Sequence, residues 1–159
     1  MRYSLSVSNI MIIYIACDHR GFNLKQFLSQ VIKSQGYDLR DLGAERYDHE
    51  DDYPDFASRV AENVLQTPGS RGVVICGSGG GVSIAANKYK GIRAFIGLNP
   101  DQAKATKLDE DTNVLALASD FISNELAAQI TEAWLKAEFS GEERHKRRLQ
   151  EISDIESKV

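Results

Sequence analysis

The feature that most constrains the fold of this chain is the alternation of short apolar runs with longer amphipathic segments. The runs have the length and composition of buried β-strands. They are residues 11–16 (MIIYIA), 37–42 (YDLRDL), 72–76 (GVVIC), 92–98 (IRAFIGL) and 112–117 (TNVLAL). Apolar residues recur at helical spacing between them, and a further helix is expected over residues 142–157. The alternation predicts an α/β protein, a three-layer α/β/α sandwich around a five-stranded parallel sheet.

The predicted sheet also suggests where a ligand would bind. We expect a doubly wound sheet with the strand order 2-1-3-4-5, in which ligands bind at the carboxyl ends of the strands where the order reverses. That point lies between the first and third strands. The first strand leads into Cys17, Asp18 and His19, and the third ends at Cys76 and Gly77. The two turns with the most reactive side chains should therefore face each other.

Length, charge and cysteine content narrow the class of protein. A chain of 159 residues suits one core, so we expect a single domain over residues 11–159 after an N-terminal tail at 1–10. The net charge of −4 gives no general attraction to nucleic acid. No run is long enough to span a membrane. Two cysteines cannot form a disulfide framework, and they favour a reducing, cytoplasmic location.

The segment NIMIIYIAC (9–17) resembles the apolar part of a short signal sequence. However, the apolar run is short, and Asp18 and His19 follow it directly. These features favour a buried first strand.

The glycine-rich segment VVICGSGGGVSIAANK (73–88) leads from the third run into a helical pattern. A dinucleotide fingerprint would need a third glycine where Val82 stands and an acidic residue where Leu98 and Asn99 stand. No Gly-Lys-Ser/Thr sequence follows, which argues against a phosphate loop of the nucleotidase type. A tight turn explains one or two of the glycines. Their number favours a backbone that approaches a ligand closely and whose free amides form an anion-binding nest.

Cys76 stands at the start of this loop. Amides at the start of a helix stabilise a thiolate, whose pKa in a free peptide is about 8.5. Ser78 is placed to hydrogen-bond either the thiol or a sugar hydroxyl. A thiolate beside an oxyanion nest suits removal of a carbon-bound proton next to a carbonyl. A buried, inert cysteine is the alternative, and a redox role fits less well because neither cysteine has a C-x-x-C partner.

Two arginines near the C-terminus, Arg144 and Arg148, are four residues apart and share one helix face. A solvated basic face above an apolar stripe of Leu149, Ile152 and Ile155 is one interpretation. The other is a bidentate clamp for phosphate or carboxylate. His19 could add a donor to the same anion. The clamp would require the helix to reach the site, for which a neighbouring subunit is one source.

Several segments occur in an order and spacing that resemble one family: ACDHRGFNLK, DDYPDFA, ICGSGGGVSIAANK, GIRA, DTNVLAL and ERHKRRLQEI. Over residues 11–155 the chain resembles the type B ribose-5-phosphate isomerases, a family that also contains the galactose-6-phosphate isomerase subunits. The resemblance implies a metal-free, cofactor-free isomerase that interconverts ribose 5-phosphate and ribulose 5-phosphate through an enediolate in the pentose phosphate pathway. It also implies a Rossmann-like fold and a homodimer or tetramer whose active sites are shared between two subunits.

The resemblance implies roles at the reacting end of the sugar. Cys76 would be the base that moves a proton between C2 and C1, and Ser78 would assist it. Val82 stands where one branch of the family has a glutamate base, so the chain resembles the branch with a cysteine base. The oxyanion amides would belong to the loop glycines Gly77, Gly79, Gly80 and Gly81.

The resemblance also implies the contacts of the remaining substrate. Asp18 and Tyr53 would contact sugar hydroxyls. The phosphate would be held by His19, Arg144 and Arg148.

The chain departs from the family pattern at three carboxylates. Asp109 and Glu110 stand where the family usually has His-Asn, so ring opening would fall to Asp109 and sugar contact to Glu110. Asp120 stands where an arginine usually helps to bind phosphate. A carboxylate a few ångströms from phosphate costs on the order of 1–4 kcal/mol. We expect an active isomerase, slower or with a shifted substrate preference. The alternatives are a hexose 6-phosphate (galactose or allose) isomerase and a phosphosugar-binding protein with weak catalysis.

Overall fold

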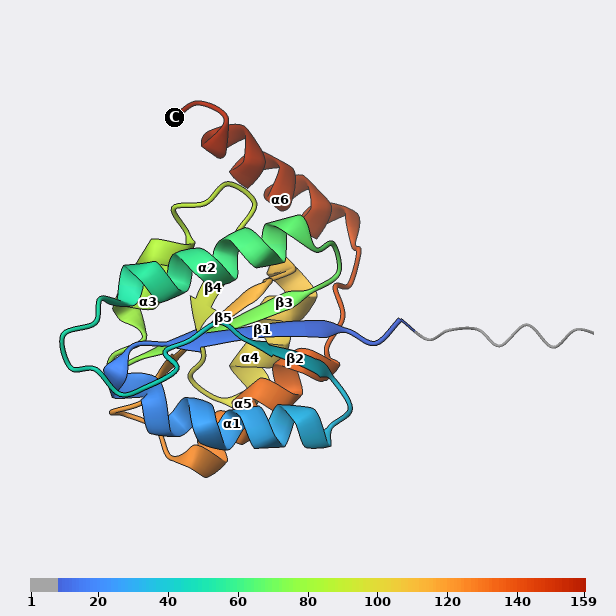
Figure 1. Ribbon diagram of the computed structural model, residues 1–159. Helices are drawn as coiled ribbons and strands as arrows, with labels where there is room; N and C mark the ends of the chain where they lie inside the picture. Colours follow the sequence, from blue (N-terminus) through green and yellow to red (C-terminus); the bar gives the residue numbers. More distant parts are fainter. Residues whose placement is uncertain (1–8) are drawn as a thin grey trace, which may run out of the picture.

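The computed structural model describes residues 9–159, and the predicted layers are present (Figure 1). All five predicted strands are confirmed in one parallel sheet: β1 (Ile12–Cys17), β2 (Asp38–Asp41), β3 (Arg71–Cys76), β4 (Ala94–Ile96) and β5 (Val114–Ala118). Most of the tail expected at residues 1–10 lies outside the described residues.

The order of the strands is β2-β1-β3-β5-β4, so the expected order 2-1-3-4-5 is wrong in its last two strands. Every residue of β5 is buried, whereas the three residues of β4 are only half-buried. The fully apolar strand therefore occupies the inner position and the short strand forms the edge. The reversal between β1 and β3 is as predicted, and it brings the two reactive turns together.

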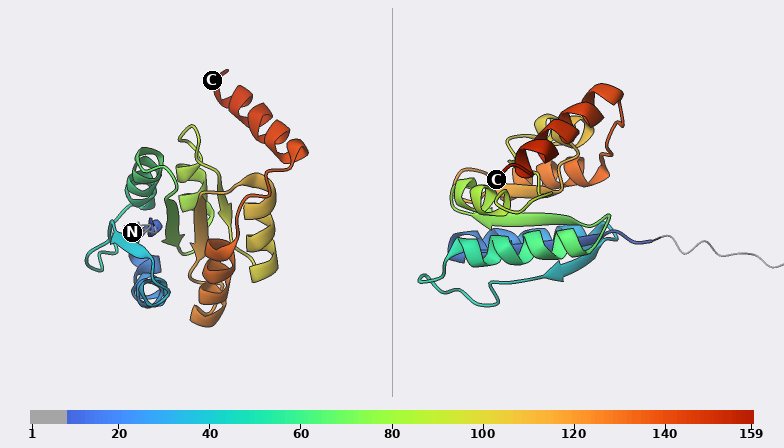
Figure 2. Two further views of the ribbon diagram at one scale, coloured as in Figure 1. Left: turned by 90° about the vertical axis from the view of Figure 1, so that its right-hand side faces the viewer. Right: turned by 90° about the horizontal axis from the view of Figure 1, so that it is seen from above.

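Helices cover both faces of the sheet. One face carries α1 (Phe22–Ser34), α4 (Pro100–Glu110) and α5 (Asn124–Lys136), which pack on it through Leu28, Ile130 and Trp134, among others. The other face carries α2 (Tyr53–Gln66) and α3 (Gly80–Ala86). A short 3-10 turn, η1 (His19–Gly21), joins β1 to α1. The expected C-terminal helix is α6 (Glu143–Glu156), which projects from the body of the molecule (Figure 2).

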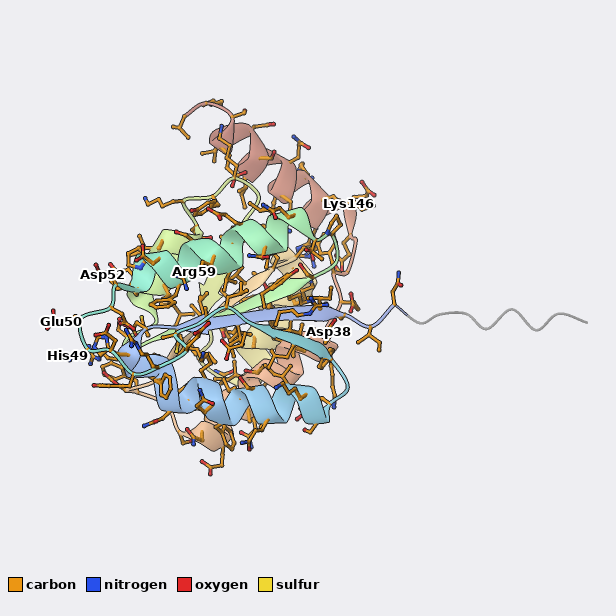
Figure 3. All side chains as sticks on the ribbon, viewed as in Figure 1. Asp38, His49, Glu50, Asp52, Arg59 and Lys146 are labelled. Atoms are coloured by element: carbon orange, nitrogen blue, oxygen red, sulfur yellow. The ribbon has the colours of Figure 1, made fainter. Side chains whose placement is uncertain are left out.

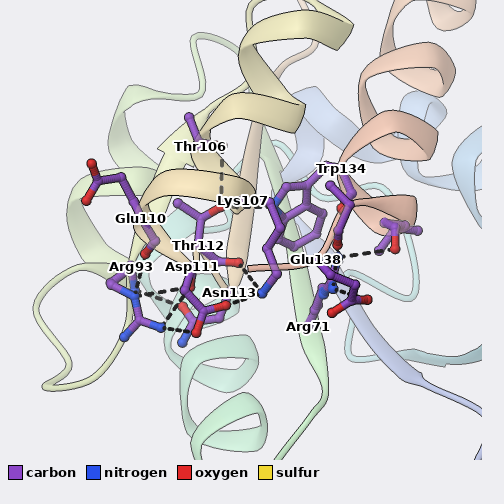
Figure 4. Close-up of polar contacts among 12 residues, drawn as sticks. Arg71, Arg93, Thr106, Lys107, Glu110, Asp111, Thr112, Asn113, Trp134 and Glu138 are labelled. Atoms are coloured by element: carbon purple, nitrogen blue, oxygen red, sulfur yellow. Dashed lines mark hydrogen bonds and ion pairs between the residues drawn. The ribbon is translucent and has the colours of Figure 1, made fainter. Parts of the chain in front are cut away.

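A polar cluster closes the amino-terminal edge of the sheet (Figure 4). The buried guanidinium of Arg71 donates to the carbonyls of Trp134 at 2.7 Å, Leu135 at 3.2 Å and Ala137 at 2.9 Å. These carbonyls lie at the end of α5, where a helix lacks its own donors. Arg71 therefore fixes α5 to the sheet, and the cluster has a structural explanation.

Within residues 9–159, no helix combines the length and apolarity needed to cross a bilayer.

Candidate active site

The carboxyl ends of β1 and β3 are joined directly. The backbone amide of Asp18 donates to the carbonyl of Ile75 at 3.2 Å, which places Asp18 beside Cys76. The Asp18 carboxylate accepts the amides of Arg20 at 3.0 Å and Gly21 at 3.2 Å, and so it caps η1. Burial raises the pKa of Asp18 above its ordinary value, and these amides oppose the shift.

The two cysteines face opposite sides of the sheet. Cys17 packs with Leu24 and Leu28 of α1, and its burial raises its pKa to about 11. Cys76 packs on the side of α2 and α3, with Phe56 and Val82, and is 4% exposed. Of the two thiols, only Cys76 therefore lies on the side of the sheet that carries the glycine loop and its helix.

The predicted glycine loop makes the turn from β3 into α3. Gly79 adopts a left-handed conformation with φ 73°, which favours glycine. The amide of Gly80 donates to the hydroxyl of Ser78 at 3.3 Å. The first turn of a helix leaves its amides without intrahelical acceptors, and Gly81 and Val82 lie in the first turn of α3. The loop has the backbone expected of an oxyanion nest.

Tyr53, the first residue of α2, lies over the start of α3. A methyl group added at Gly81 would come within 2.7 Å of the Tyr53 ring. Glycine at position 81 therefore permits this close approach. Tyr53 is 41% exposed, so its other edge is open to solvent.

Asp51, which the sequence analysis missed, holds His19. Its Oδ1 lies 2.7 Å from Nδ1 of His19 and accepts the backbone amide of the same residue at 3.0 Å. Asp18, His19 and Asp51 have the donor types of a cation site, with one ligand atom each within 4.8 Å of the others. Hydrogen bonds engage one oxygen of each aspartate, and Oδ1 of Asp51 orients His19. Oδ2 of Asp51 is buried and has no hydrogen-bond partner among the described residues.

A second missed feature is an ion pair between Arg20 and Asp120 over the glycine loop. The amide of Asp120 donates to the carbonyl of Gly77 at 3.0 Å. A methyl group at Gly77 would lie only 2.4 Å from the Arg20 guanidinium carbon. The carboxylate of Asp120, which stands where the family usually has an arginine, is therefore paired with a cation of the same chain.

The remaining predicted residues lie elsewhere on the molecule. Asp109 and Glu110 end α4, which begins after β4 and runs back to the amino-terminal edge of the sheet. Arg144 and Arg148 lie exposed on the projecting helix α6. The structure thus brings together Asp18, His19, Tyr53, Cys76, Ser78 and the loop glycines. Within one chain, it does not bring the α4 and α6 residues to them.

The two separated groups are joined through a histidine that the sequence analysis passed over. His145 of α6 is 3% exposed, and its Nε2 lies 3.7 Å from the carboxylate of Asp109. This contact packs the start of α6 against the end of α4. Asp109, Arg144 and Arg148 therefore lie on the same part of the molecule.

Comparison with known proteins assigns this arrangement to a family. The family model described as Ribose/Galactose Isomerase matches residues 13–152. The chain belongs to the ribose/galactose isomerase family. It is 40% identical to ribose-5-phosphate isomerase B of Escherichia coli, over 92% of this chain and 97% of the relative. The resemblance inferred from the sequence motifs is confirmed.

Solved structures of ribose-5-phosphate isomerases B have the same fold. The Clostridium thermocellum protein is 44% identical and superposes with a TM-score of 0.89, covering 93% of this chain and 99% of its own. The Mycoplasma genitalium protein, solved with bound ribulose-5-phosphate, is 37% identical with a TM-score of 0.89, covering 94% and 98% of the two chains. The fold of the ribose/galactose isomerase family is therefore retained over nearly the whole chain.

Proposed function

We propose that the protein is an aldose–ketose isomerase that interconverts D-ribose 5-phosphate and D-ribulose 5-phosphate. The observation that carries the proposal is the position of Cys76, the last residue of β3, next to the end of β1 that carries Asp18 and directly before the glycine loop. A base beside a group of amides is what removal of a proton next to a carbonyl requires. Membership of the ribose/galactose isomerase family and the ribulose-5-phosphate held by a relative support this substrate class.

The chemistry follows from these groups. The Cys76 thiolate removes the proton from C2 of the open-chain aldose, and the C2–H electrons form the C1–C2 double bond of an enediolate. The amides of Gly81 and Val82 stabilise the developing negative charge on oxygen. The thiol then returns the proton to C1, and the hydroxyl proton of O2 passes to O1 with help from Ser78. The carbonyl moves from C1 to C2, and no atom is gained or lost.

We propose further that each site is completed by a second copy of the chain. Arg144 and Arg148 are exposed on α6, and the helix also exposes apolar side chains, Ile152 at 39% and Ile155 at 62%. A second subunit that covers these isoleucines would bring α6 and the end of α4 to its own glycine loop. The phosphate would then meet His19 of one subunit and two arginines of the other. We place this homo-oligomer in the cytoplasm, where its free thiols would stay reduced.

A mixing experiment tests the shared site. Cys76→Ala and Arg148→Ala each remove a residue from a different half of the site. Homodimers of either variant should be inactive or weak. Random heterodimers from an equal mixture contain one site with both residues intact, so activity should return to about one quarter of the wild-type value. An equal mixture of Cys76→Ala with Ser78→Ala, both from the same half, should recover nothing. Equal recovery in the two mixtures would overturn the shared site.

A hexose 6-phosphate isomerase is the second candidate, because the family model that matches the chain is described as Ribose/Galactose Isomerase. Relative kcat/KM values for ribose 5-phosphate, galactose 6-phosphate and allose 6-phosphate separate the two functions. We expect ribose 5-phosphate to be preferred. A phosphosugar-binding protein with weak catalysis would instead show binding with negligible turnover of all three.

A further inference from the structure

The ion pair between Arg20 and Asp120 occupies the approach to the proposed catalytic loop. Arg20 follows His19 in the turn η1, so two basic side chains leave the same turn of backbone. Each is held by a carboxylate from elsewhere in the chain, His19 by Asp51 and Arg20 by Asp120. The guanidinium lies directly over Gly77, the residue after Cys76.

The backbone around this pair is fixed on both sides. The hydroxyl oxygen of Ser119 lies 2.9 Å from the carbonyl of Arg20 and 3.0 Å from that of Cys76, so the two carbonyls share its single proton. The amide of Ser119 also donates to the Cys76 carbonyl at 2.9 Å. The segment after β5 is thereby tied to both η1 and the glycine loop. Arg20 and Asp120 consequently face each other across a short, rigid span.

The pair still has a side open to a ligand. The side chain of Arg20 is 56% exposed and that of Asp120 is 35% exposed. A guanidinium carries five N–H donors in a planar fork, and one carboxylate does not occupy them all. The open edge of the fork can bind a second anion, and phosphate matches its geometry.

We propose that Arg20 is a substrate-binding residue that contacts the phosphate of the sugar, and that Asp120 is a positioning residue that holds the guanidinium over Gly77. This inference rests on the proposed function, because it takes the glycine loop as the substrate site. With Arg20, the part of the site that one chain supplies, Asp18, His19 and Cys76, gains a cation that stays charged at all working pH values. It also explains how a carboxylate at position 120 is compatible with an anionic substrate.

The test measures binding of ribose 5-phosphate and of inorganic phosphate by calorimetry, alongside KM and kcat. Arg20→Ala should weaken binding of both ligands about tenfold or more, as expected for loss of a charge-assisted contact. Turnover at saturation should change far less. Arg20→Lys should recover part of the affinity, because it retains the charge but lacks the fork.

The double variant separates the two roles. Arg20→Ala leaves Asp120 unpaired near the ligand, so Arg20→Ala/Asp120→Ala should bind more tightly than Arg20→Ala alone. Asp120→Asn keeps an acceptor for the guanidinium without the charge, and should raise KM by about two- to fivefold with little change in kcat.

Arg40→Ala is the matched control. Arg40 forms a comparable exposed pair with Asp38 at 2.7 Å, with 53% and 40% of the side chains exposed. Figure 3 places Asp38 at the end of the sheet opposite His49 and Glu50, which lie near the carboxyl ends. Arg40→Ala should leave the affinity for ribose 5-phosphate and for inorganic phosphate within about twofold of the wild type.

The outcomes distinguish this inference from the proposed function. Affinity of Arg20→Ala equal to that of Arg40→Ala would overturn the role of Arg20, whatever the turnover. Binding that depends on Arg20 without any turnover in the wild-type protein would support Arg20 and overturn the isomerase. No binding of ribose 5-phosphate by the wild-type protein would overturn both.

Discussion

Oδ1 of Asp51 lies 2.7 Å from Nδ1 of His19 and 3.0 Å from the backbone nitrogen of the same residue. One oxygen atom therefore fixes both the ring and the backbone of His19, the residue that we expect to bind the phosphate. The loop that carries Asp51 is distant in sequence from η1, so this contact couples the entry to α2 with the end of β1.

Asp51→Asn should hold the His19 ring less firmly, while the asparagine still fills the space of Asp51. The amide lacks the charge that strengthens the bond to the imidazole, so KM for ribose 5-phosphate should rise about five- to tenfold, with a smaller change in kcat. Glu50→Gln is the control in the same loop, because Glu50 pairs only with the exposed His49. Steady-state kinetics that give both variants the same KM would contradict the role of Asp51.

Gly81→Ala should displace Tyr53. The added methyl group would meet the ring at 2.7 Å, closer than any relaxed contact, whereas at Gly80 the nearest atom is the Ser78 hydroxyl oxygen at 3.4 Å. We expect kcat/KM to fall about tenfold in Gly81→Ala and about threefold or less in Gly80→Ala. Thermal unfolding of both variants checks that the folds are equal. Equal losses of kcat/KM in the two would show that the position of Tyr53 is unimportant.

Cys17 makes stability depend on alkaline pH. Burial raises its pKa from 9.0 to about 11, so the unfolded chain loses the thiol proton before the folded protein does. The contribution of the Cys17 thiol to the free energy of unfolding is fully present below the pKa of the thiol in the unfolded chain. It is lost as the pH rises toward the pKa in the folded protein, by about 2–3 kcal/mol at most. Urea unfolding at a series of pH values should show a shallower alkaline decline in Cys17→Ala and Cys17→Ser. An unchanged decline in both would contradict the assignment.

Arg71→Met should destabilise the fold without altering the site. The substitution removes the donor to three carbonyls at the end of α5, and buried unpaired carbonyls together cost about 3 kcal/mol or more. Arg147→Ala on α6, with its side chain 66% exposed, should change the free energy of unfolding by less than about 0.5 kcal/mol. Denaturant unfolding measures both values. A loss for Arg71→Met as small as that for Arg147→Ala would show that the cluster does not fix α5.

Much of the fold follows from the sequence because four of the five strands are largely apolar runs between helical patterns. The exception is β2 (Asp38–Asp41), in which three of the four residues are charged. The order of β4 and β5 does not follow, since the runs around Phe95 and Leu115 are similar in length and composition. What separates them is burial on both faces, which depends on the packing of α3 and α5. Such tertiary contacts determine which strands lie next to each other in a sheet, and the local sequence pattern says little about that order.

The site divides in the same way. Cys76, Asp18 and the glycine loop were predictable because strand ends of a parallel sheet converge. Asp51 and Arg20 were missed because each acts through a partner far along the chain. A signal for Arg20 was present in the sequence, since it adjoins His19 in the turn expected to face the loop. Its pairing with Asp120 depends on the path of the chain after β5, which motif spacing does not reveal.

The most direct test is conversion of ribose 5-phosphate to ribulose 5-phosphate by the wild-type protein, Cys76→Ala and Cys17→Ala. Cys17 is the matched control, because it is the other buried thiol and lies on the opposite face of the sheet. We predict turnover in the wild type and in Cys17→Ala, and a loss of at least about a thousandfold in Cys76→Ala with its fold intact. Wild-type turnover that persists in a folded Cys76→Ala protein would contradict the assignment of Cys76 as the base.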